Sequence, residues 1–176
     1  MKIVEAKGYM KINKKEFEDK VGIKLQSNIN AIGIDTASRT GWCKISVNTK
    51  TISFNYGFIN IDSKNIYFKY NEIVNTFYEL LHTPLDIVII EDTFYRFNPN
   101  MFKMISRIGA TAYTLAHLNH QKAKYLLATS ARKALGIKGN CKKAEVAVYL
   151  KEVLNLNITD DDIADSIVLA INGVLE

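Results

Sequence analysis

The chain has 176 residues, of which 48% are hydrophobic and 23% are charged, a balance typical of one globular domain and unlike a disordered or fibrous protein. Its longest apolar runs, such as residues 85–90, are far shorter than the roughly 20 residues that cross a bilayer, and no signal peptide opens the sequence, so we expect a cytoplasmic protein without a membrane partner. The net charge of +5 favours a polyanionic partner.

The first 28 residues are rich in lysine, and Phe17, Val21 and Leu25 are spaced as on one face of a helix. We interpret residues 1–28 as a basic N-terminal extension with one helix, and residues 29–176 as the main domain. Three β-branched and aromatic runs open that domain, at 30–35, 41–47 and 50–60. Their short connections predict an antiparallel meander.

Helices and strands alternate after the meander. Helical spacing covers residues 66–82 and 100–119, a continuous apolar run at 85–91 indicates a buried parallel strand, and a further strand is predicted at 123–128. A short helix ending at Gly136, a helix over 142–154 and a last helix over 160–174 complete the chain. The pattern predicts an α/β fold whose mixed five-stranded sheet, three antiparallel strands followed by parallel ones, is flanked by helices.

One segment of the chain carries positive charge alone. Residues 122–143 contain no acid and hold Lys122, Lys124, Arg132, Lys133, Lys138, Lys142 and Lys143. A block of one sign attracts phosphate groups, which favours nucleic acid as the partner.

Carboxylates occupy the ends of two predicted strands and one helix. Asp35 and Glu91 each follow an apolar run, and Asp162 and Asp165 are three residues apart and so share a helical face. If the two strands are neighbours, all four acids meet at one sheet edge, where a divalent cation such as Mg²⁺ would neutralise them. Two such ions can activate water and stabilise the leaving oxygen of a phosphodiester.

Structural explanations compete with this one for single residues. Asp35 alone fits a turn residue equally well, and the acids at 160–162 follow Thr159 as a helix cap would. Asp165 is different, because it stands on the second turn among apolar residues, where an acid needs a partner or a metal.

In this order the acids, Asp, Glu and a late Asp-x-x-Asp, resemble the RuvC resolvases of the RNase H-like superfamily over about residues 30–174. The segment IGIDTASRTGW is similar to the family's first motif, and DDIADSIVLAI to its last helix. Glu91 opens Glu-x-x-Phe, in which the family's phenylalanine, here Phe94, stacks on a base. GIKGNCKKAEV looks like the segment that carries a catalytic-site lysine, here Lys143, with Lys142 as the second choice. Thr36 and Ala37 replace the Pro-Gly of many bacterial members, in a turn one residue shorter, which is closer to phage-type relatives.

The resemblance implies a Holliday junction resolvase in a bacterial or phage-infected cell, a homodimer that cuts four-way or branched DNA without a small-molecule cofactor. Two Mg²⁺ ions, or Mn²⁺ in their place, would bind Asp35, Glu91, Asp162 and Asp165, and Lys143 would steady the scissile phosphate. The residues expected to contact DNA are Phe94, Arg96, Arg132, Lys138, Lys142 and Lys143. Two alternatives stay open: a related nuclease acting on RNA–DNA hybrids or flaps, and a non-catalytic module that binds branched DNA. An actin-like ATPase is disfavoured, because DTASRTG has too little glycine for a phosphate loop.

Overall fold

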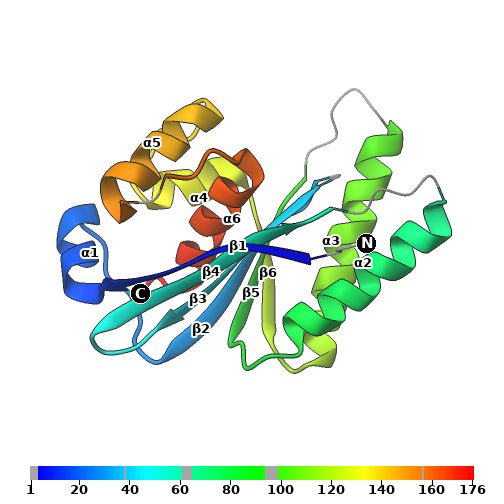
Figure 1. Cartoon of the computed structure of the whole chain (residues 1–176), viewed down its shortest axis with the longest axis horizontal. Coiled ribbons are helices and arrows are strands. Elements are labelled where there is room, and N and C mark those ends of the chain that lie inside the picture. Colours follow the sequence, from blue (N-terminus) through cyan, green and yellow to red (C-terminus); the bar gives the residue numbers. More distant parts are fainter. Residues whose placement is uncertain (1–3, 38, 61–64, 94–98, 156) are drawn as a thin grey trace.

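The computed structural model describes residues 4–37, 39–60, 65–93, 99–155 and 157–176. In this part of the chain six strands form one mixed sheet in the order β1-β4-β3-β2-β5-β6 (Figure 1). The strands are β1 (Val4–Asn13), β2 (Ile29–Asp35), β3 (Thr40–Val47), β4 (Thr51–Ile59), β5 (Ile87–Glu91) and β6 (Lys122–Leu126). The pairs from β1 to β2 are antiparallel, while β2, β5 and β6 are parallel. The predicted meander followed by parallel strands is confirmed.

Helices cover both faces of this sheet. In the described residues they are α1 (Lys14–Val21), α2 (Ile66–Leu81), α3 (Pro99–Leu118), α4 (Ala128–Ala134), α5 (Lys143–Leu154) and α6 (Asp161–Asn172). Helices α2 and α3 lie on one face, and α1, α4, α5 and α6 lie on the other (Figure 1). None of the described helices is long and apolar enough to pass through a lipid bilayer.

The sheet has one strand more than the five predicted, because the N-terminal extension joins it. Strand β1 pairs with β4 along its length, with Met10 opposite Phe54. The predicted helix of the extension exists as α1, but it ends at Gly22, whose φ of 75° is a left-handed cap. Leu25 therefore lies beyond the helix, where it is fully buried and forms a bridge with Leu175 near the other end of the chain.

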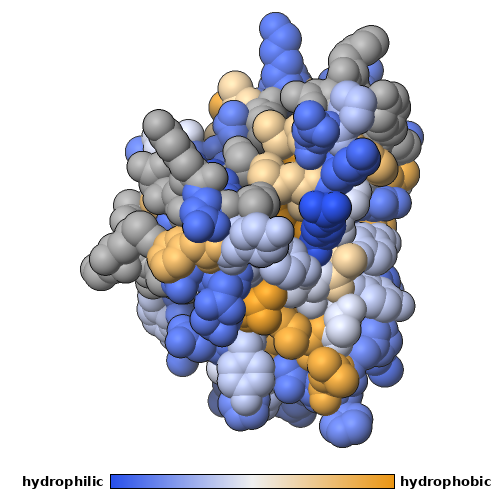
Figure 2. Space-filling view, turned by 90° about the vertical axis from the view of Figure 1, so that its right-hand side faces the viewer, coloured by the Kyte–Doolittle hydropathy of each residue, from blue (hydrophilic) through white to orange (hydrophobic). Residues whose placement is uncertain are grey.

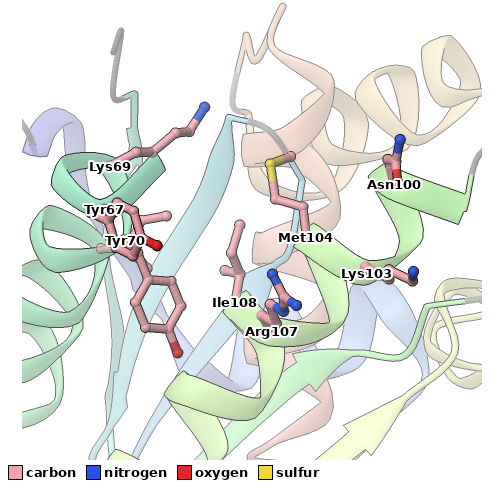
Figure 3. Close-up of a pocket in the computed structure, with 9 residues that line it drawn as sticks. Tyr67, Lys69, Tyr70, Asn100, Lys103, Met104, Arg107 and Ile108 are labelled. Carbon is pink, nitrogen blue, oxygen red and sulfur yellow. The ribbon is translucent and has the colours of Figure 1, made fainter. Parts of the chain in front are cut away.

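Helices α2 and α3 pack together on their face of the sheet. Phe77 of α2 and Ala112 of α3 lie in the apolar layer against β2 and β5, and the Tyr70 hydroxyl is 2.7 Å from Thr111 Oγ1. Towards solvent the two helices enclose a groove of about 780 Å³, with Tyr70 on one wall and Met104 on the other (Figure 3). Figure 2 shows apolar side chains exposed between polar ones on this side of the molecule.

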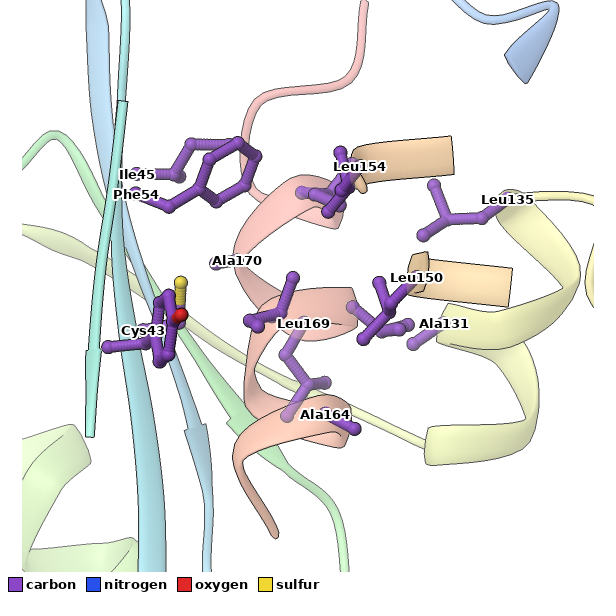
Figure 4. Packing of buried hydrophobic residues seen from close by; sticks show 14 of the residues in the cluster. Cys43, Ile45, Phe54, Ala131, Leu135, Leu150, Leu154, Ala164, Leu169 and Ala170 are labelled. Atoms are coloured by element: carbon purple, nitrogen blue, oxygen red, sulfur yellow. The ribbon is translucent and has the colours of Figure 1, made fainter. Parts of the chain in front are cut away.

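Helix α6 lies between the sheet and the helices α4 and α5 (Figure 4). Residues 163–172 of this helix are all buried. Two glycines let its backbone approach the strands closely: a Cβ atom at Gly33 would lie 2.2 Å from Ser166 O, and one at Gly41 would lie 2.1 Å from Asp162 O. Helix α6 is thereby held directly against β2 and β3, which sets the position of its acidic first turns.

Candidate active site

The four predicted acids line one cavity of about 650 Å³. Strands β2 and β5 are parallel neighbours with Ile34 opposite Ile90. Asp35 and Glu91, the last residue of each strand, therefore lie side by side at one edge of the sheet. Asp162 and Asp165 come from the first two turns of α6. The sequence therefore predicts the place of these side chains, although three separate elements supply them.

Asp35 is the most buried of the four, with 4% of its surface exposed. Burial raises the pKa of Asp35 well above its ordinary value, and a hydrogen bond with Glu91 and the charges of Glu91, Asp165 and Asp162 raise it further. Such a carboxyl ionises readily only when a positive charge is close by. The cavity is thus built to favour a cation.

Asp165 has a cationic partner within the protein. Arg132 of α4 donates from Nη2 to both of its oxygens at 2.8 Å and from Nε to Oδ1 at 3.2 Å. The arginine is 8% exposed and the aspartate 5%. The sequence predicts a partner or a metal for Asp165, and this pair supplies the partner. The sequence predicts that Arg132 contacts DNA, whereas in the structure its guanidinium is buried against Asp165. A DNA contact by Arg132 stays a prediction.

A second arginine, which the sequence analysis did not single out, reaches the start of α6. Arg39 forms a hydrogen bond with Asp160, and its Nη1 lies 3.6 Å from Asp162 Oδ2. The guanidinium also covers the ring of Phe58, 3.6 Å from its centroid. Burial alone would raise the pKa of Asp160, but hydrogen bonds from Arg39 and from the Ile163 N–H outweigh it and lower that pKa. The only sequence signal for Arg39 was its place between Asp35 and the Thr-Gly pair of the first motif.

The other predicted residues are placed to different extents. Lys142 lines the acidic cavity and caps α5. Lys138 borders a neighbouring hollow of about 780 Å³ that shares Thr129 with the cavity. Lys143 begins α5, but its side chain is outside the described part of the structure. Phe94 and Arg96 also lie outside the described residues.

The donor set fits a hard divalent cation in kind, because four carboxylates line one cavity. As the side chains stand, no three Asp, Glu, His or Cys residues of the described chain are close enough to hold one ion. Two of the acids face arginines instead. Ion binding would therefore require small side-chain movements within the cavity.

Comparison with known proteins identifies the family and supports the fold. The family model described as crossover junction endodeoxyribonuclease RuvC matches residues 31–173. The Thermus thermophilus RuvC structure is 17% identical, with a TM-score of 0.68 over 81% of this chain and 92% of that one. The same organism's RuvC in complex with a Holliday junction substrate is 16% identical, with a TM-score of 0.69 over 81% and 90% of the two chains. These likenesses show the fold. No curated protein sequence gives a significant match.

Proposed function

Because this chain belongs to the RuvC family of crossover junction endodeoxyribonucleases, we propose that it is a Holliday junction resolvase that hydrolyses phosphodiester bonds in four-way or branched DNA with two Mg²⁺ ions. Mn²⁺ would serve in their place. The observation that carries the proposal is the convergence of Asp35, Glu91, Asp162 and Asp165 on one cavity. A carboxylate cluster beside a lysine-rich surface suits metal-assisted cleavage of a polyanion.

Each element has a part in the proposed mechanism. Strands β2 and β5 hold the backbone of Asp35 and Glu91 and α6 holds that of Asp162 and Asp165, so the four ligands would reach the ions by side-chain movements alone. The bound ions would activate the attacking water and neutralise charge on the phosphate. Lys143 would contact the scissile phosphate from the start of α5.

Substrate binding would use the basic residues around the cavity. Lys142 lies at its rim and Lys138 beside the adjoining hollow, where both can contact phosphates on either side of the cleaved bond. Phe94 and Arg96, in the segment after Glu91, would add base stacking and a further phosphate contact. The solved complex of Thermus thermophilus RuvC with a Holliday junction substrate supports branched DNA as the partner.

The proposed enzyme is a homodimer whose subunits meet through the side bearing α2 and α3. Tyr67 is 85% exposed, Phe68 45% and Tyr70 42%, and Met104 lines the groove between the helices (Figure 3). Apolar side chains gathered on one surface are characteristic of protein interfaces. This side lies across the sheet from α6 (Figure 1).

The decisive experiment is a cleavage assay on synthetic four-way junctions with the Asp35→Asn variant. We expect Mg²⁺-dependent cutting by the wild type and a loss of at least about a hundredfold in the variant, since removing a metal's supporting groups already costs 10–100-fold. Junction binding should persist because lysines supply it. Asp19→Asn, at an exposed position of α1, is the matched control and should cut normally.

A substrate panel separates the alternatives. Flaps, Y-forms, duplex DNA and RNA–DNA hybrids are tested beside the junction under the same ionic conditions. Preferential cutting of hybrids or flaps would identify a different nuclease specificity. Binding of junctions without cutting in Mg²⁺ or Mn²⁺ would identify a non-catalytic module, and normal cleavage by Asp35→Asn would remove that residue from the proposed metal site.

A further inference from the structure

A buried guanidinium occupies one side of the acidic cavity. Arg132 bonds both carboxylate oxygens of Asp165, and its Nη1 donates to Cys141 O at 3.4 Å. The planar fork of an arginine matches a carboxylate in a way that a lysine ammonium cannot. Arg132 is thus held at a fixed place inside the cavity rather than at its rim.

The packing of α4 on α6 explains why the guanidinium stays there. Ala131 and Arg132 are the buried residues of α4, and Asn172 of α6 donates from Nδ2 to Ala131 O at 3.0 Å. Arg132 therefore enters the cavity from α4, which is hydrogen-bonded to α6, the helix that carries Asp165. Breaking such a buried pair by removing one member leaves an uncompensated charge, which is strongly destabilising.

We propose that Arg132 is a built-in counter-ion of Asp165, and that a divalent cation binding through Asp165 competes with it. This inference rests on the proposed function, because it concerns the same metal site. Both oxygens of Asp165 already accept bonds from the guanidinium, so a cation approaching them meets a positive charge at hydrogen-bond distance. The arginine is a positioning residue that holds the Asp165 side chain in place before any cation enters.

The proposal predicts that the thermal stability of the protein depends more strongly on divalent cations once the Arg132 guanidinium is removed. Without divalent cations, Arg132→Met should melt roughly 6–20 °C below the wild type. Mg²⁺ should then raise the Tm of Arg132→Met by several degrees more than that of the wild type, because the ion replaces the missing charge. The variant should also bind Mg²⁺ at least about tenfold more tightly, since a repulsive charge is gone.

The experiment compares thermal unfolding of the full chain in EDTA, in Mg²⁺ and in Ca²⁺, with calorimetric titration of Mg²⁺. Lys133→Met removes a charge from an exposed position of the same helix and is the matched control, which should respond to cations as the wild type does. Arg132→Lys keeps the charge without the fork and should lie between wild type and Arg132→Met. The double variant Arg132→Met/Asp165→Asn removes both members of the pair and should fold without cations.

If Mg²⁺ raises the Tm of Arg132→Met and of wild type equally, or if the variant binds Mg²⁺ more weakly, the inference about Arg132 is wrong. The proposed function would be unaffected by either result. If Arg132→Met is unfolded in EDTA, recovery of its folded spectrum on adding Mg²⁺ supports the proposal, and failure to fold at any Mg²⁺ concentration while the double variant folds overturns it. Absence of Mg²⁺ binding in every protein, wild type included, would instead refute the proposed metal-dependent function.

Discussion

Gly41 is the position where one methyl group should disturb both the fold and the proposed chemistry. It lies on β3 beneath the first turn of α6. A Cβ atom there would be 2.1 Å from Asp162 O and 2.4 Å from Asp162 C, and both are backbone atoms that cannot rotate away. The distance from this Cβ atom to Asp162 O is about 1.3 Å shorter than the 3.4 Å at which ordinary van der Waals contact begins. Gly41→Ala must therefore push the start of α6 away from the sheet.

The size of the effect follows from that displacement. Overpacking of this kind costs about 1–3 kcal/mol, which corresponds to a Tm roughly 2–12 °C lower for a chain of this length. Asp162 would move relative to Asp35 and Glu91, and misplacement by about 1 Å can cost on the order of a hundredfold in rate. We expect cleavage to fall by that factor even at temperatures where the variant is fully folded.

Calorimetry for the Tm and junction cleavage at saturating Mg²⁺ measure the two effects separately. Gly109→Ala is the matched control, because a Cβ atom there has its nearest neighbour at 3.4 Å and alanine favours the helix interior by up to about 1 kcal/mol. That variant should be as stable as the wild type or more so, and equally active. A Gly41→Ala protein with wild-type Tm and cleavage would show that α6 does not lie against β3 as described.

Two further predictions concern pH and assembly. Burial, Glu91 and the other carboxylates raise the pKa of Asp35 in the folded protein, so the folded state binds the proton more strongly, and stability falls as pH rises from the unfolded value of about 3.9 through the folded pKa. In EDTA, urea unfolding should therefore show Asp35→Asn more stable than wild type at pH 8, with the difference shrinking towards pH 4. If Asp35→Asn and wild type have the same unfolding free energy at pH 8 as well as at pH 4, the prediction is wrong. Light scattering should show a smaller dimer fraction for Phe68→Ser on α2 than for the control Tyr9→Ser on β1, and an unchanged mass for Phe68→Ser would exclude the α2 surface from the interface.

Local patterns were sufficient to predict most of the elements. Helix α2 has continuous apolar periodicity and ends before Pro84, and β5 is an apolar run that ends on Glu91. Strand β1 could not be read in this way, because its partner β4 begins 38 residues after β1 ends and its lysines obscure any alternation. Leu25 was assigned to the helix by spacing alone, whereas its burial comes from the distant end of the chain.

Local patterns also predict the four acids of the candidate site, since strand ends and one helical face have clear sequence signatures. They do not predict which acids the two arginines contact. Arg132 and Asp165 are 33 positions apart, and Arg39 and Asp160 are 121 apart, so no local pattern links either pair. Within a block of one sign, Arg132 looked like a surface charge, because charge sequence reports nothing about burial.

Strand β1 also changes which backbone is left open at the border of the sheet. Without it, β4 would present nine residues rich in apolar and aromatic side chains, Thr51–Ile59, as an unpaired template on which another molecule could add a strand and begin to aggregate. With it, the outermost strand bears the exposed Lys11 and an irregularity between Ala6 and Gly8, while the opposite border, β6, bears the exposed Lys122 and Lys124. Charges and a break in register both discourage edge-to-edge pairing, so the extension replaces an apolar border of the sheet with one less suited to adding a further strand.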